Sequence, residues 1–202
     1  MAASRAYLVA AGLALAGALA MGKGMDGGGP RADYRDHGGP RALWHIPDGP
    51  ALPPAAPARV RIPAIGVDAP VARVGLNGDG TVEVPPLRHA DRIGWYAPGP
   101  APGARGPAVL LGHYDDRDGP AVFHRLHRLR PGDEIRVARD GGGAAVFRVD
   151  AAERVPKWRF PRTRVYGKVR YAGLRLVTCG GAYDEADGSY RDNLIVYAHL
   201  VR

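Results

Sequence analysis

The sequence predicts a mostly β domain, either a closed barrel or a sandwich, preceded by an export segment and a linker. Short alternating or apolar runs, separated by turn residues, recur regularly after residue 58. Turn signals such as N-G-D-G at 77–80 and D-G-G-G at 140–143 lie between these runs. The 29 Gly and 19 Pro among 202 residues also favour many turns over long helices.

Residues 1–22 predict a signal peptide or an N-terminal membrane anchor. The stretch 6–21 is apolar or glycine and lies between Arg5 and Lys23. It is short for a membrane span of about 20 residues, and A-L-A at 18–20 fits a cleavage site. Both alternatives place the body of the protein outside the cytoplasm, either anchored at the cell surface or secreted.

Residues 23–58 predict a linker, and 59–202 a single domain. The linker contains G-M-D-G-G-G-P and D-G-P-A-L-P-P-A-A-P, whose prolines favour an extended, semi-rigid chain. The segments of the domain that read as strands are 60–62, 69–74, 81–84, 93–96, 108–113, 134–138, 145–149, 174–179 and 194–201. Only 120–129 and 161–166 read as helical.

Charge and motifs exclude several classes of protein. The formal net charge of +8 and the pI near 10.0 favour anionic surroundings, such as wall polymers or lipid head groups. The sequence has no P-loop, no dinucleotide fingerprint and no paired Cys or Cys-His spacing typical of a zinc site. We therefore expect no cofactor, no metal and no nucleic-acid partner.

Cys179 is the only cysteine, in L-R-L-V-T-C-G-G, where Gly180 and Gly181 are expected to end a buried strand directly after it. A core cysteine is the plain alternative. However, an unpaired thiol in an exported protein has no internal disulfide partner, which favours chemistry over packing. A nucleophilic thiolate needs a basic or cationic neighbour.

Two residues are candidates for a basic or cationic neighbour of Cys179. His113 ends the apolar run P-A-V-L-L-G-H, so it is expected to emerge from a strand end as Cys179 does. Arg191 lies twelve residues after Cys179, immediately before the last predicted strand, and a turn would return it alongside the cysteine. Its guanidinium could stabilise an oxyanion or orient a carbonyl group.

The ordered motifs resemble a sortase, and most closely the class F sortases. They are G-H-Y-D, G-P-A-V-F-H-R-L, P-G-D, F-P-R-T-R-V-Y-G, L-V-T-C-G-G and Y-R-D-N-L-I-V-Y-A. The resemblance implies a closed eight-stranded β-barrel with one or two short helices. By position it implies that Cys179, His113 and Arg191 are the catalytic residues. Sortases usually have T-L-x-T-C at the nucleophile, whereas this chain has Arg175 at the first position.

The resemblance also implies a reaction. Cys179 would cleave the Thr-Gly bond of an LPxTG-type sorting signal through a thioester, and an amine of the cell wall would accept the acyl group. The expected partners are exported proteins with such signals and a peptidoglycan precursor or another amine, with membrane contact through residues 1–22 if they are not removed.

Substrate binding is expected from Thr178, which matches the motif, and from the loop before the cysteine strand. In sortases this loop forms a wall of the groove, and here it contains Trp158, Phe160, Val165 and Tyr166. Packing of the loop itself explains these residues equally well. Between residues 154 and 175 there are eight Lys or Arg and no acid, which fits a solvated basic face or adhesion to an anionic wall.

Other classes fit less well. An L,D-transpeptidase-like wall enzyme would have S-H-G-C around its nucleophile, and wall-hydrolase peptidases place Cys before His. A wall-associated β-barrel that only binds remains an alternative. Asp115, Asp116 and Asp118 could suggest calcium, but their spacing lacks a downstream bidentate Glu, so a polar turn is expected.

Overall fold

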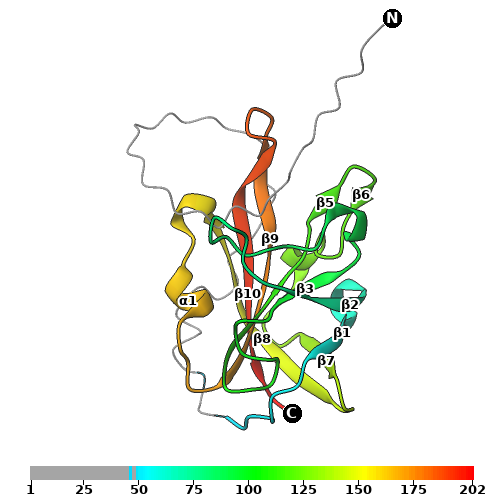
Figure 1. Ribbon diagram of the computed structural model, residues 1–202, viewed down its shortest axis with the longest axis vertical. Coiled ribbons are helices and arrows are strands. Elements are labelled where there is room, and N and C mark those ends of the chain that lie inside the picture. Colours follow the sequence, from blue (N-terminus) through cyan, green and yellow to red (C-terminus); the bar gives the residue numbers. More distant parts are fainter. Residues whose placement is uncertain (1–45, 47–48) are drawn as a thin grey trace, which may run out of the picture.

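Eight strands form a closed barrel in the computed structural model, which describes residues 46 and 49–202 (Figure 1). Around the barrel the order is β1-β2-β3-β4-β9-β10-β8-β7, and β5 pairs with β6 in a separate two-stranded sheet. The bounds are β1 Pro57–Ile62, β2 Val67–Val74, β3 Ile93–Tyr96, β4 Gly106–Leu111, β5 Asp115–Asp116, β6 Gly119–Pro120, β7 Glu134–Arg139, β8 Ala144–Pro156, β9 Ala172–Asp184 and β10 Ser189–Leu200.

The helices are short and lie between strands. Within the described residues there is one α-helix, α1 (Arg162–Tyr166), in the connection from β8 to β9. The 3-10 helices of the described chain are Pro63–Ile65, Leu87–His89, Leu126–Arg128 and Lys157–Arg159. The mostly β barrel with short helices that the sequence predicted is therefore confirmed.

Alternation along the strands divides the apolar residues between two clusters. Side chains such as Leu110, Leu174 and Val196 fill the barrel. Their sequence neighbours point outward, and a second cluster forms there because the segment containing α1 covers this face with Val165. The sheet around β9 is thus buried on both faces, as its nearly continuous apolar sequence indicates.

The β9–β10 hairpin projects beyond the rest of the barrel at one end (Figure 1). Gly180 and Gly181 predicted that the strand ends after Cys179, but β9 continues to Asp184. Gly181 takes a φ of +80°, where β9 carries an extra residue relative to β10. A bulge therefore absorbs the two glycines without ending the pairing.

Two other local predictions were wrong. Residues 81–84 form no strand and contribute only an isolated bridge between Leu76 and Val82. Residues 120–129 form turns and the 3-10 helix Leu126–Arg128 rather than an α-helix. This segment buries Phe123 and Leu126 in the barrel core, and that packing decides its conformation over the helical spacing.

The predictions for residues 1–22 and for most of the 23–58 linker lie outside the described residues. The described end of the linker contacts the barrel, since the Leu52 N–H donates to the Gly103 carbonyl at 2.8 Å. Within the described chain, no helix combines the length and the apolar character that crossing a membrane requires.

Gly112, between β4 and His113, is required by close packing. A Cβ there would lie 2.5 Å from Phe123 Cδ2 and 2.8 Å from Val122 Cγ1. We expect Gly112→Ala to lower the free energy of unfolding by about 2 kcal/mol, because overpacking a filled core strains its neighbours. Urea denaturation measures this. Gly78→Ala is the control, since a Cβ at Gly78 meets nothing within 4 Å. Equal stability of the two variants would contradict the packing argument.

Candidate active site

Cys179 lies on the outer face of β9, partly exposed, at the edge of the outer apolar cluster. Val177 belongs to the same cluster, whereas Leu176 and Leu174 point into the barrel. Alternation therefore places the thiol on the covered outer face of the sheet rather than in the barrel core. The plain alternative of a core cysteine does not describe this position.

His113 follows β4 and is 6% exposed. Its Nε2 lies 2.6 Å from the carbonyl oxygen of Pro85. A carbonyl oxygen only accepts hydrogen bonds, so Nε2 donates and carries the proton in this arrangement. Nδ1 is then the ring nitrogen available for proton exchange with a ligand.

The strand register brings His113 and Cys179 to the same height. β4 and β9 are parallel neighbours with Leu111 opposite Val177, and the Gly112 N–H continues the ladder to the Val177 carbonyl at 3.1 Å. Two residues beyond this pair, the two chains reach His113 and Cys179. Val109 and Leu111 share the outer cluster with Val177, so the alternation also assigns both side chains to the outer face.

Burial and two charges set the state of the thiol. Burial raises the pKa of Cys179 above its ordinary value, the positive charge of Lys157 lowers this pKa, and the negative charge of Asp115 raises it. The resting thiol is therefore protonated at neutral pH. Lys157 and Asp115 received no such role from the sequence, although Asp115 follows His113 by only two residues.

Arg191 lies in β10, not before it, and its side chain is directed to the hairpin. Its Nε and Nη2 each lie 3.0 Å from Asp184 Oδ2, and the side chain is 65% exposed. This pairing lowers the pKa of Asp184. Arg191 therefore lies on β10, the strand next to Cys179, but its guanidinium is paired with the Asp184 carboxylate.

The expected substrate-binding residues occupy different environments. Trp158 is 67% exposed, with the Arg159 guanidinium 4.5 Å from its ring centroid. Phe160 and Tyr166 pack against the outer cluster, with their ring centroids 6.2 Å apart. Val165, a residue of α1, is fully buried, so its side chain packs the loop onto the barrel.

Thr178 is also fully buried, and it points to the barrel side of β9, opposite to Cys179. Its Oγ1 has no hydrogen-bond partner. The structure therefore does not bring its side chain to the face that exposes the thiol.

A pair of tyrosines separates two cavities beside the α1 loop. Tyr96, in β3, contacts Tyr166 edge to face with the centroids 5.8 Å apart. One cavity of about 630 Å³ is lined by these rings and by 98–100, 105–107 and 168–169. The other, of about 210 Å³, adds Leu76 and Val82 to the same two rings. Tyr96 was not selected by the sequence analysis, because its contact with Tyr166 is long-range.

Arg175, which replaces the usual Thr of the motif, is 1% exposed beneath the α1 loop. Its Nη2 donates to Tyr171 Oη at 3.0 Å, and its Nη1 and Nε donate to the carbonyls of Leu174 and Arg164 at 3.0 and 3.3 Å. The guanidinium carbon also lies 4.9 Å from the ring centroid of Tyr197. Arg175, which stands in place of the usual Thr, therefore attaches the loop to the barrel.

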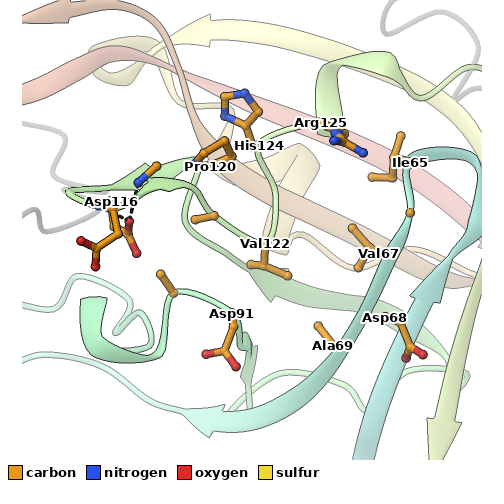
Figure 2. A pocket seen from close by; sticks show the side chains of 15 residues that line it. Ile65, Val67, Asp68, Ala69, Asp91, Asp116, Pro120, Val122, His124 and Arg125 are labelled. Atoms are coloured by element: carbon orange, nitrogen blue, oxygen red, sulfur yellow. Dashed lines mark hydrogen bonds between the residues drawn. The ribbon is translucent and has the colours of Figure 1, made fainter.

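The aspartates after His113 form a turn. Asp116 Oδ1 accepts from the N–H groups of Asp118 at 2.8 Å and Gly119 at 3.1 Å, and Asp115 accepts from the Tyr190 hydroxyl. A cavity of about 460 Å³ adjoins this turn. Figure 2 shows Asp68, Asp91 and Asp116 at separate positions around the cavity.

Across residues 46 and 49–202, no three His, Cys, Asp or Glu side chains are grouped so that they could hold a metal ion. The carboxylates of Asp116 and Asp115 are used in the turn and in the contact with Tyr190, respectively.

Comparisons with known proteins bear on the family and the fold. The sortase domain family model matches residues 60–201. No curated protein matches the sequence. Among solved structures, a sortase D5 transpeptidase from Clostridium perfringens is 22% identical with a TM-score of 0.54, covering 73% of this chain and 79% of that chain.

Two further solved structures are similar. A lid mutant of sortase A from Corynebacterium diphtheriae is 18% identical, with a TM-score of 0.56 and coverage of 75% of this chain and 73% of that chain. Sortase C-1 from Actinomyces oris is 22% identical, with a TM-score of 0.54 and coverage of 72% and 73%. These likenesses show a shared fold.

The closed eight-stranded barrel, with Cys179 on the outer face of β9, defines the class of fold. The match of the family model over most of the chain shows that it belongs to the sortase family, the transpeptidases that act outside the cytoplasm on sorting-signal proteins and amine acceptors.

The buried guanidinium generates a prediction about stability. We expect Arg175→Thr to lower the free energy of unfolding by about 3 kcal/mol, since it leaves a void and removes the partner of buried polar groups. Chemical denaturation measures the loss. Arg148→Ala is the matched control, because Arg148 is half exposed and its ion pair with Glu134 lies at the surface. An Arg175→Thr variant as stable as the parent would show that the guanidinium does not hold the loop.

Proposed function

We propose that this sortase cleaves the Thr-Gly bond of an LPxTG-type sorting signal and transfers the acyl group to an amine of the cell wall. The observation that carries the proposal is the β4–β9 register, which aligns His113 with Cys179 on the outer face. The motif order that resembles class F sortases supports placement in that class. Residues 59–202 would form the catalytic domain, with residues 1–22 as its anchor or removable signal.

In the first step, the Cys179 thiolate attacks the Thr carbonyl carbon and the C–N bond to Gly breaks. His113, as imidazolium, gives a proton to the departing amine, and the product is a thioester. In the second step, the acceptor amine loses a proton to His113 and attacks the thioester. The C–S bond breaks, and the thiolate and imidazolium are regenerated.

The thiol must lose its proton to start this cycle. Burial keeps the pKa of Cys179 high at rest. Proton transfer to Nδ1 of His113 would create the thiolate and the imidazolium together, and each charge would stabilise the other at close range. The ion pair would then be the reactive form, populated as the substrate arrives.

Arg191 is proposed to stabilise the oxyanion of the tetrahedral intermediate. Along β10 it alternates onto the same face as Ile195, which belongs to the outer cluster with Cys179. Its contact with Asp184 is exposed to solvent, and such pairs contribute little. A substrate carbonyl can therefore compete for the guanidinium at small cost.

The sorting signal would lie along the α1 loop. Trp158, Phe160 and Tyr166 offer aromatic surface, and the cavity that contains Leu76 and Val82 offers an apolar site for its leucine or proline. Val165 would act by holding the loop. Thr178 would act through its backbone, since its side chain points away from the thiol face.

Peptide cleavage tests the proposal. We expect the full chain to cut a fluorescent LPxTG peptide between Thr and Gly, with the fragments identified by mass spectrometry. Cys179→Ala should abolish cleavage, because it removes the nucleophile. Cleavage that persists without the thiol would refute the mechanism. A parent protein that binds such peptides and cuts none of them would favour the binding module.

The role of Arg191 has a separate test. We expect Arg191→Ala to reduce kcat about 100-fold, the usual loss for an oxyanion donor, with unfolding unchanged because the side chain is exposed. Arg61→Ala is the matched control, since Arg61 is also exposed and paired with an aspartate, in β1 on the far side of the barrel. Parental turnover in Arg191→Ala would remove this residue from the site.

A further inference from the structure

Asn193 in β10 is a buried polar residue for which the mechanism above has no use. It is 1% exposed, and neither Oδ1 nor Nδ2 of its side chain has a hydrogen-bond partner. A buried amide without a partner destabilises the folded state. Its presence there calls for a ligand or a second state of a neighbouring group that would satisfy it.

The strand register identifies that neighbour. Asn193 lies directly opposite Cys179 in the antiparallel β9–β10 pair, and opposite Val155 of β8 on its other side. Side chains that are directly opposite in such a pair have Cβ atoms about 4.5–5.5 Å apart. Val155 offers no hydrogen-bonding group. The sulfur of Cys179 is therefore the polar atom that faces the amide across the strands.

The side chains of Asn193 and Cys179 both point to the outer face of the sheet. Ile195 and Val177, two residues from Asn193 and Cys179 respectively, belong to the same outer cluster, and they are themselves paired across β9 and β10. Because residues two positions apart in a strand share a face, Asn193 and Cys179 lie on the same face as Ile195 and Val177. The amide and the thiol consequently share one patch of the surface beneath the substrate loop.

We propose that the side-chain amide of Asn193 stabilises the thiolate of Cys179 by donating an N–H···S hydrogen bond. This inference rests on the proposed role of Cys179 as nucleophile. A protonated thiol is a weak acceptor, which fits the absence of a bond in the resting structure, whereas a thiolate is a charged and much stronger acceptor. The unsatisfied amide is thus matched to the reactive state of the enzyme.

The other groups around the sulfur do not supply such a donor. Lys157 lowers the pKa of Cys179 and Asp115 raises it, both through space. Tyr190 also interacts electrostatically with the thiol, but its hydroxyl donates to Asp115. His113 is the proton acceptor of the proposed ion pair and donates Nε2–H to a carbonyl. A neutral donor beside the sulfur would complement these charges.

Alkylation of the single cysteine tests the inference without any peptide substrate. The rate of reaction of the full chain with iodoacetamide is followed by mass spectrometry between pH 5 and 10. We expect Asn193→Leu to shift the midpoint upward by about one pH unit, which gives about tenfold slower alkylation below the midpoint. Its thermal unfolding temperature should stay the same or rise, since an unsatisfied amide is replaced by an apolar group of similar volume.

A purely structural role predicts the opposite pair of results. An unchanged alkylation profile in Asn193→Leu together with a lower unfolding temperature would overturn the proposal. Asn193→Ala provides the second reading should the leucine variant fail to fold, and an unchanged profile there would overturn it equally. Asn77→Ala is the control, because Asn77 is an exposed loop residue whose amide donates to Thr81, and it should leave the profile unchanged.

The design separates this inference from the proposed function. A shifted alkylation profile in a protein that cuts no LPxTG peptide would support the role of Asn193 and count against the proposed substrate. Efficient cleavage of the peptide together with an alkylation profile that substitution of Asn193 does not change would support the proposed substrate and count against the role of Asn193.

Discussion

The position of β9 between two neighbours is the constraint on which the site depends. β9 hydrogen-bonds to β4 along one edge and to β10 along the other. These two ladders place Cys179 between the chain that leads to His113 and the strand that carries Asn193 and Arg191. A slip of one residue would turn Cys179 into the barrel and bring Thr178 to the outer face. The buried apolar residues of both faces oppose such a slip, so the core of the fold also fixes the face of β9 on which Cys179 lies.

A polar network beneath the α1 loop holds the other side of the site. Glu153 of β8 accepts three hydrogen bonds from Arg164, at 2.9, 3.0 and 3.2 Å, and another from the Tyr197 hydroxyl. Arg175 stacks on Tyr197 and reaches the loop backbone. The loop is therefore attached by directional bonds to two strands of the barrel. These bonds hold the loop in place against the barrel.

Local pattern predicted the barrel because strand alternation and turn chemistry are encoded over a few residues. The bounds of β3 agree with the expected 93–96, whereas β8 and β9 extend well beyond their expected ends. Their extensions pair with β10, and the partner strand supplies hydrogen bonds that a sequence window does not contain. The helix expected at 120–129 failed for the same reason, since the burial of Phe123 is a tertiary effect.

The sequence also indicated the position of some residues of the candidate site and not of others. Cys179 and His113 end or follow apolar runs, so their strands could be identified, and the parallel pairing of those strands aligns them. The contact of Arg191 with Asp184 and the burial of Asn193 depend on the β9–β10 register, including a bulge at the glycines. An Asn two positions before a buried isoleucine in a strand is the only signal that could have indicated its orientation.

The raised pKa of Cys179 has a consequence for the lifetime of the protein. Oxidants such as peroxide react with thiolates and only slowly with thiols. The family acts outside the cytoplasm, and the chain offers no second cysteine that could rescue a sulfenic acid as a disulfide. A sulfur that stays protonated at rest reacts slowly with such oxidants, and this protects the one thiol of a chain that has no second cysteine to repair it.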